Sequence, residues 1–198
     1  MNDPGTVPVP PLFPDSDLDR VFRALRFAAR FHKTQRRKDG VTPYINHPID
    51  VAVTLYDSGG VRDAELLQAA LLHDTIEDTD ATADDLRLEF GEAVVALVLE
   101  VTDDKSLPKA QRKALQIQRA PEKSDRAKLL KLADKICNIH DITHSPPEWT
   151  LERMEAYLDW SEAVIAGVRG VNPGLERRFD ETMTAARTAL LQRRSSDR

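Results

Sequence analysis

The sequence has few features that would tie it to a membrane, an oxidising compartment or a nucleic acid. Its single cysteine, Cys137, excludes a disulfide within the chain and is typical of a reducing cytoplasm. Its apolar runs are too short to cross a bilayer, and its N-terminus lacks the basic and then apolar pattern of a signal peptide. The net charge of -5 disfavours a nucleic acid polymer, whose binding needs a basic surface. We therefore expect a cytoplasmic protein with neither a membrane nor a nucleic acid as partner.

Period-two alternation of apolar and polar residues, which indicates half-buried strands, is also missing. Helical periodicity recurs instead, and it predicts helices over residues 17–33, 48–57, 64–72, 83–101, 124–143, 149–168 and 175–191, with another starting at Pro108. A chain of 198 residues with 41% hydrophobic content suits one domain with a sizeable core. We predict an all-α fold with a disordered Pro-rich lead-in at 1–16, one domain at 17–192 and a polar tail at 193–198.

The most informative stretch follows residues 64–72, a segment that is apolar at nearly every position and predicts a buried helix. One histidine and three carboxylates come directly after it, namely His73, Asp74, Glu77 and Asp78. Burying these groups without partners is costly, so a metal ion or a charged ligand is implied. We interpret His73 and Asp74 as adjacent metal ligands and Glu77 with Asp78 as an acid/base pair one turn further on. Solvated acids at a helix end are the alternative.

Two further segments offer ligands that would complete a metal site. His47 precedes Pro48, which suits the first turn of a helix, and a histidine there is otherwise structural. Asp134 lies between apolar residues in the helix expected over 124–143. An ion pair with Lys131 or Lys135 is the alternative for this aspartate. As a last ligand it would complete an octahedral-type site open to water.

Two groups of cations are candidates for binding phosphate. Arginine offers bidentate donors and lysine a compact charge, so the run from Arg36 to Lys38 suits a phosphate clamp. The alternative is a solvated helix end, where cations complement the helix dipole. The second group is formed by Lys105, Lys109 and Arg112, for which surface charges are the favoured interpretation. Tyr157 is expected in the core, with contact to a nucleobase as the alternative.

Four segments in a fixed order resemble a known family. They are HKTQRRKDGVTPYINHP from His32, AALLHDTIEDTDAT from Ala69, EVTDDKSLPKAQRKALQ from Glu100 and AKLLKLADKICNI from Ala127. Together they resemble the HD-domain metal-dependent phosphohydrolases, in particular the hydrolase domain of RelA/SpoT homologues. The resemblance is strongest to the stand-alone small alarmone hydrolases typified by the metazoan SpoT homologue. It implies a compact multi-helix HD fold over residues 17–192.

The resemblance also implies a role for each candidate residue. The expected ligands of one Mn²⁺ per chain are His47, His73, Asp74 and Asp134. The expected catalytic acids are Glu77 and Asp78, and the residues expected at the substrate are Arg37, Lys38 and Asn138. Two positions depart from the family pattern, because His140 stands where an arginine is common and Cys137 where a bulkier residue is common.

The activity that the resemblance implies is removal of the 3′-pyrophosphate of ppGpp or pppGpp, which gives GDP or GTP and pyrophosphate. One alternative keeps the site but changes the substrate to an adenosine alarmone or to NADPH, which would lose its 2′-phosphate. Another is a sensor that binds an alarmone without cleaving it, although the intact pair of Glu77 and Asp78 disfavours this. The oligomeric state stays open, with a homodimer as one alternative.

Overall fold

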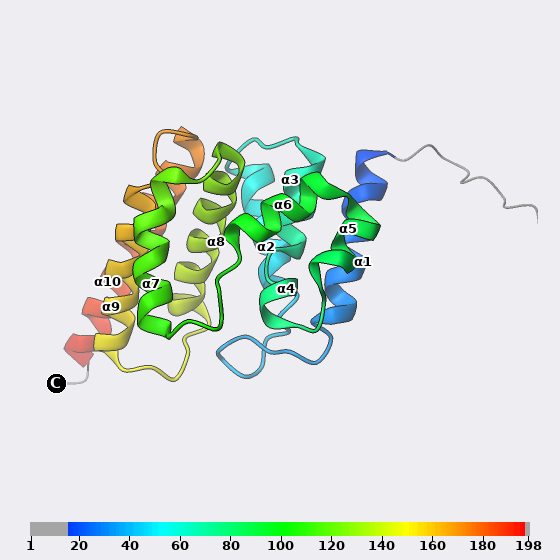
Figure 1. The fold of residues 1–198 in the computed structure, drawn as a ribbon. Helices are drawn as coiled ribbons and strands as arrows, with labels where there is room; N and C mark the ends of the chain where they lie inside the picture. The colour runs from blue at the N-terminus through cyan, green and yellow to red at the C-terminus, as the bar shows by residue number, and fades with distance from the viewer. Residues whose placement is uncertain (1–15, 197–198) are drawn as a thin grey trace, which may run out of the picture.

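The computed structural model describes residues 16–196, and its regular structure there is helical (Figure 1). The elements are α1 (Asp17–Phe31), α2 (Asn46–Asp57), α3 (Ala64–Leu72), α4 (Thr75–Asp78), α5 (Ala83–Phe90), α6 (Glu92–Val101), α7 (Lys109–Arg119), the 3-10 turn η1 (Ala120–Glu122), α8 (Asp125–His144), α9 (Leu151–Ala166) and α10 (Pro173–Ser196). Residues 16–196 contain no strand, and an isolated bridge joins Arg36 to Pro43. The all-α prediction is therefore confirmed. The predicted lead-in lies outside the described residues except for Ser16.

Helix α3 lies at the centre of one half of the molecule, packed against α1, α2 and α6 (Figure 1). Nearly all of its side chains are buried, as the apolar run predicted. Its one strongly polar buried side chain, Gln68, donates a hydrogen bond of 3.1 Å to the carbonyl of Arg20 in α1. Helix α8 packs against both α2 and α10 and so connects this half to the other. The ends of α2, α3 and α8 are thereby fixed relative to one another.

Capping side chains set where several of these helices begin. Ser16 and Asp19 form a reciprocal capping box at the start of α1. Asp63 Oδ1 accepts hydrogen bonds of 3.1 Å from the N–H groups of Glu65 and Leu66 at the start of α3.

Among the described helices, none combines the length and the apolar character that a membrane span requires.

Three segments differ from the sequence-based expectation. The helix expected over 83–101 is two helices, because Gly91 adopts φ = 82°, a left-handed conformation that interrupts a helix and that glycine tolerates. Helix α3 has the predicted bounds, but after His73 and Asp74 the four-residue α4 follows as a separate turn that was not predicted. At the other end of the domain α10 continues past Gln192 to Ser196.

Candidate active site

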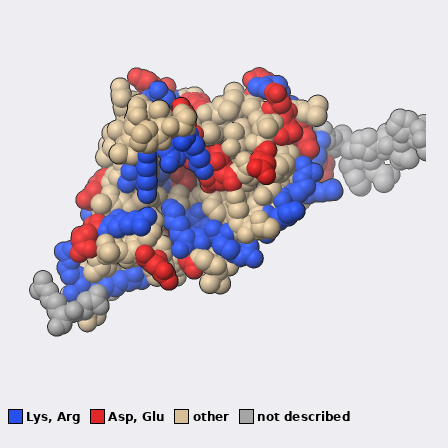
Figure 2. Space-filling view, turned by 60° about the horizontal axis from the view of Figure 1, so that its bottom comes forward, with Lys and Arg blue, Asp and Glu red and all other residues tan. Residues whose placement is uncertain are grey.

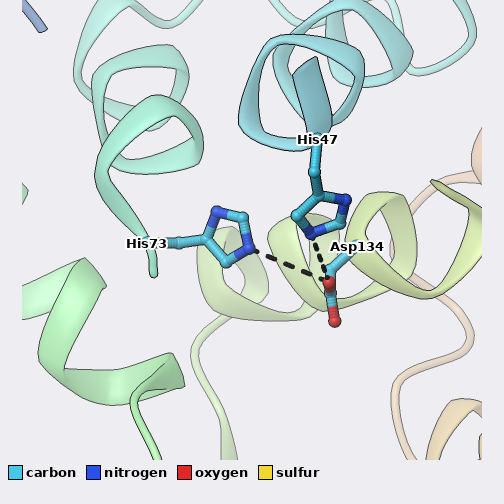
Figure 3. A group of neighbouring side chains, drawn as sticks. All are labelled: His47, His73 and Asp134. Carbon is cyan, nitrogen blue, oxygen red and sulfur yellow. Dashed lines mark ion pairs between the residues drawn. The ribbon is translucent and has the colours of Figure 1, made fainter. Parts of the chain in front are cut away.

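His47, His73 and Asp134 come from three different helices and meet at one point (Figure 3). His47 lies in the first turn of α2, His73 directly follows α3, and Asp134 lies midway along α8. Asp134 Oδ1 is 3.3 Å from Nε2 of His47 and 3.8 Å from Nε2 of His73. One ligand atom of each residue lies within 4.8 Å of the others, a spacing that suits the coordination of one metal ion.

Asp74, the fourth expected ligand, lies beside this group. Its Oδ2 atom is 3.2 Å from Nε2 of His73 and 3.7 Å from Nε2 of His47. The hydroxyl of Tyr44 donates a hydrogen bond of 2.6 Å to the same oxygen. The structure therefore brings together all four side chains that the sequence indicated. Sequence reasoning missed Tyr44, for which the available signal was its place in the segment that also contains His47.

The hydrogen bonding of His73 provides a test of whether a metal fits. Its Nδ1 lies 2.8 Å from the carbonyl oxygen of Ala70, so Nδ1 carries the hydrogen and Nε2 presents a lone pair. This buried Nε2 has no hydrogen-bond donor among the described residues, and it faces carboxylate oxygens of Asp74 and Asp134. A lone pair directed at anionic oxygens is unfavourable unless either a proton or a metal cation lies between them. Two imidazoles with two carboxylates are a donor set that suits divalent metals.

The electrostatic field at this point also favours positive charge. Burial opposes a charge on His73, but the carboxylates of Asp74 and Asp134 outweigh it and raise the pKa of the imidazole to about 9. Burial likewise opposes ionisation of Asp134, yet Lys135 and the two imidazoles hold the pKa of its carboxyl well below the usual range. Burial lowers the pKa of His47, which keeps that ring neutral. The field that stabilises a proton on His73 stabilises a metal cation in the same place.

Glu77 and Asp78 lie in α4 beside this cluster, and both contact residues of α7 or of the segment that precedes it. Glu77 Oε2 accepts a hydrogen bond of 3.1 Å from the N–H of Asp103, and its Oε1 is 3.7 Å from Nη1 of Arg112. Asp78 accepts a hydrogen bond from the ammonium of Lys105. Burial raises the pKa of Glu77, so its carboxylate is a stronger base than that of an exposed glutamate.

Arg37 and Asn138 connect the loop after α1 to Asp134 of the cluster. The guanidinium of Arg37 donates to Asp141 Oδ2 from Nε at 2.9 Å and from Nη2 at 2.6 Å. Its Nη2 also donates to Asn138 Oδ1 at 2.9 Å, and Asn138 Nδ2 donates to Asp134 Oδ1 at 2.5 Å. Burial opposes the charge on Arg37, but the carboxylate of Asp141 outweighs it and raises the pKa. Several donors of the arginine are thus engaged within the protein.

A cavity of about 580 Å³ opens in front of these residues, a size typical of small-molecule sites. Ten lysines and arginines line it, namely Arg36, Arg37, Lys38, Lys105, Lys109, Arg112, Lys113, Lys131, Lys135 and Arg153. Five acids line it, namely Asp74, Glu77, Asp78, Asp103 and Asp134. Figure 2 shows basic side chains gathered around a hollow at the centre of this face. A wall with twice as many cations as acids suits an anionic ligand, although the whole chain is acidic.

Aromatic rings and cations alternate along one side of the cavity. Trp149, Tyr157 and Trp160 pack against the core, as expected for Tyr157, and all three are also part of the cavity wall. Lys38 Nζ lies 5.1 Å from the centre of the Trp149 ring and 5.6 Å from that of Tyr157. Lys113 Nζ lies 4.5 Å from the centre of the Trp160 ring. Such a wall can stack a planar base beside charged phosphate groups.

Other positions differ from the expectation. Lys105, Lys109 and Arg112, for which surface charges were the favoured interpretation, all line the cavity. His140 stacks on His144 with 3.8 Å between ring centres, and Cys137 Sγ lies 3.4 Å from the hydroxyl of Thr54. Within residues 16–196 the cavity wall includes neither His140 nor Cys137, so neither departure from the family pattern lines the site.

The chain matches a model of the HD domain over residues 24–158. It is 52% identical over 163 residues to guanosine-3′,5′-bis(diphosphate) 3′-pyrophosphohydrolase MESH1 of Homo sapiens, a match that covers 81% of this chain and 91% of that protein. It is 50% identical over 167 residues to the protein of the same name from Xenopus tropicalis, which covers 83% of this chain and 93% of that protein.

Two solved structures are also similar. The first is a metazoan ortholog of SpoT that hydrolyzes ppGpp and plays a role in starvation responses. It superposes with a TM-score of 0.82 and 45% sequence identity, and the match covers 87% of this chain and 97% of that structure's chain. The second, lmo0812 from Listeria monocytogenes, has a TM-score of 0.62 and 30% identity and covers 75% of this chain and 98% of that chain. The chain therefore belongs to the HD-domain family, in the group that contains the metazoan ortholog of SpoT.

Proposed function

We propose that the protein hydrolyses the 3′-pyrophosphate of ppGpp and pppGpp, giving GDP or GTP and pyrophosphate. The observation that carries this proposal is the convergence of His47, His73, Asp74 and Asp134 beside Glu77, at the base of a cavity lined mainly by cations. The similarity to 3′-pyrophosphohydrolases over more than 90% of their length supports the same substrate class.

We assign the four converging side chains to one divalent metal ion and propose Mn²⁺. Bound there, the ion would offset charge on phosphoryl oxygens and make a water molecule more acidic. The chain contributes the orientation of the ligands, through the Ala70 carbonyl on His73 and the Tyr44 hydroxyl on Asp74. The ligand types suit several divalent metals, so metal analysis and exchange are the test of Mn²⁺.

In the proposed reaction, a water oxygen bonds to the phosphorus that is attached to the ribose 3′ oxygen. The bond between this phosphorus and the 3′ oxygen breaks. Glu77 takes one proton from the water, because burial raises the pKa of its carboxyl group and so makes its carboxylate a stronger base. The electron pair of the broken bond stays on the 3′ oxygen, which takes up a proton. We assign delivery of that proton to the pair formed by Asp78 and Lys105.

The rest of the wall would bind the nucleotide. The substrate carries two diphosphate groups, and Lys38 with the lysines of α7 supplies charges opposite to theirs. The aromatic side formed by Trp149, Tyr157 and Trp160 suits the guanine base. We assign Arg37 and Asn138 to positioning as well as to binding, since they bond both to each other and to groups on α8.

The test is to measure turnover of ppGpp, pppGpp and NADPH in parallel, with Mn²⁺ and with a chelator. We expect metal-dependent release of pyrophosphate from ppGpp and pppGpp, and Glu77→Gln is the matched control that should retain the metal. Release of orthophosphate from NADPH, with no turnover of ppGpp or pppGpp, would support the same active site but identify NADPH as the substrate. Binding of ppGpp without turnover would indicate that the protein is a sensor and not an enzyme.

A further inference from the structure

Lys131 is a buried cation near the metal-ligand cluster. It lies in α8 one turn before Asp134, and its residue is 7% exposed. Among residues 16–196 its ammonium has neither a hydrogen-bond nor an ion-pair partner. Lys135 on the same helix differs, because its Nζ lies 3.3 Å from Asp134 Oδ2 and 4.3 Å from the centre of the Trp160 ring. A buried charge without a partner is costly, which indicates that an anion completes the surroundings of Lys131.

The position of Lys131 indicates which anion it would meet. A second hollow of about 410 Å³ adjoins the main cavity, and Lys131 and Arg112 belong to the walls of both. The expected metal ligands line the main cavity and are not part of the described wall of the second hollow. Lys131 therefore lies where the main cavity, which holds the expected metal ligands, adjoins the second hollow.

The charges around Lys131 fit the same conclusion. Burial lowers the pKa of its ammonium and the neighbouring charge of Lys135 adds to this, while Asp134 and Asp103 act in the opposite direction. The net shift is downward, so the carboxylates of the protein do not fully offset the burial of this charge. A bound phosphate would supply the missing negative charge at the junction of the two hollows.

We propose that the ammonium of Lys131 binds the terminal phosphate of the 3′-pyrophosphate, and that it makes the site prefer a pyrophosphate over a single phosphate. The inference rests on the proposed function, in which the phosphorus that is attacked lies beside the metal ligands and Glu77. The phosphate one bridging oxygen further on then lies beyond the ligand cluster, toward the second hollow, where Lys131 is a buried cation without a hydrogen-bond or ion-pair partner among residues 16–196.

The experiment compares inorganic pyrophosphate with orthophosphate as ligands of the metal-loaded protein. Binding of each is measured by calorimetry with Mg²⁺ in excess, so that pyrophosphate does not remove the metal from the site. The variant is Lys131→Met, which keeps an unbranched side chain shorter by one atom and removes its charge. Lys128→Met is the matched control, because Lys128 lies one turn earlier on α8 and belongs to the wall of neither hollow.

We expect Lys131→Met to weaken pyrophosphate binding by about 10- to 100-fold, as loss of a charge-assisted hydrogen bond implies. Orthophosphate binding and metal content should stay within about 3-fold of the unmodified protein, as should both affinities of the control. Lys131→Arg should restore part of the preference, and kcat/KM should fall more for ppGpp than for its analogue with a single 3′-phosphate.

Equal weakening for both anions would overturn the proposal, as would unchanged pyrophosphate binding or a Lys131→Arg variant no better than Lys131→Met. Loss of bound metal in Lys131→Met would also overturn it, because the lysine would then act on the ligand cluster. The two proposals can fail separately. If the protein does not hydrolyse ppGpp but Lys131→Met still weakens pyrophosphate binding, the proposed substrate is refuted and the contact between Lys131 and pyrophosphate is supported.

Discussion

Removal of a single oxygen, in Tyr44→Phe, tests whether the hydroxyl of Tyr44 organises the site. This hydroxyl donates to Asp74 Oδ2 at 2.6 Å and to Asp78 Oδ2 at 3.1 Å. Burial and the carboxylate of Asp74 raise its pKa, so it stays a donor throughout the working pH range. The ring itself packs on His32, with 4.8 Å between ring centres, and phenylalanine keeps that contact.

The magnitude follows from the hydrogen bond to Asp74. A hydrogen bond to a charged group contributes about 1.5–3 kcal/mol, and loss of a group that orients a metal ligand costs about 10- to 100-fold in metal affinity or activity. Asp78 keeps its bond from Lys105, so most of the effect should arise at Asp74. We expect the Kd for Mn²⁺ to rise by about 10- to 100-fold in Tyr44→Phe, with a smaller fall in kcat at saturating metal.

Calorimetric titration with Mn²⁺ and steady-state kinetics at high metal concentration separate these two effects. Tyr56→Phe is the control, because Tyr56 is 46% exposed and lies outside the described wall of the cavity. A Kd for the metal within about 3-fold of the unmodified protein, together with unchanged kcat, would refute the role assigned to Tyr44.

Other substitutions test the remaining assignments. Asp134→Ala is expected to lose bound metal and turnover together, and stoichiometric metal in elemental analysis would contradict its role as a ligand. Glu77→Gln should retain metal but lose about 10²- to 10⁴-fold in kcat, so full activity would mean that another group is the base. Because burial raises the pKa of Glu77, its carboxylate protonates at a higher pH than an ordinary glutamate as the pH falls. The acidic limb of kcat/KM should therefore lie above pH 4.5, and a limb at or below this value would contradict the shift. Arg37→Ala leaves Asp141 without its main partner, and the two side chains are 8% and 32% exposed. We therefore expect the free energy of unfolding, measured with denaturant, to fall by about 1–3 kcal/mol and KM to rise. If both values were unchanged, Arg37 would be a solvated surface charge.

The sequence predicted the helices and the side chains that converge at the candidate site because each depends on a local pattern. The apolar run of α3 and the polar group that follows it are read directly from neighbouring residues, and the family motifs link them to His47 and Asp134. The break at Gly91 was missed because apolar periodicity continues across it, while the positive φ that ends α5 is a property of the backbone. A glycine within a helical pattern is the signal that could have located it.

The surroundings of the ligands could not be predicted in the same way. Arg37 was expected to face a substrate, and its bonds to Asp141 depend on how a loop packs against a helix 104 residues further along the chain. Lys105 and Arg112 looked like surface charges because their contacts with α4 also join distant segments. A side chain's periodicity predicts which face of a helix it lies on, but not which charge from elsewhere lies opposite it.

The arrangement of the proposed ligands on separate helices would also tie metal binding to folding. His47, His73 and Asp134 are separated by 26 residues (47 to 73) and 61 residues (73 to 134), so an unfolded chain does not present them together. An ion that binds the folded chain alone stabilises it by RT ln(1 + [M]/Kd), which is about 2.7 kcal/mol when the free metal concentration is 100 times Kd. The melting temperature of the protein should therefore rise with free metal concentration even without a nucleotide. Thermal unfolding becomes a measure of metal occupancy, and it ranks candidate ions without any knowledge of the substrate.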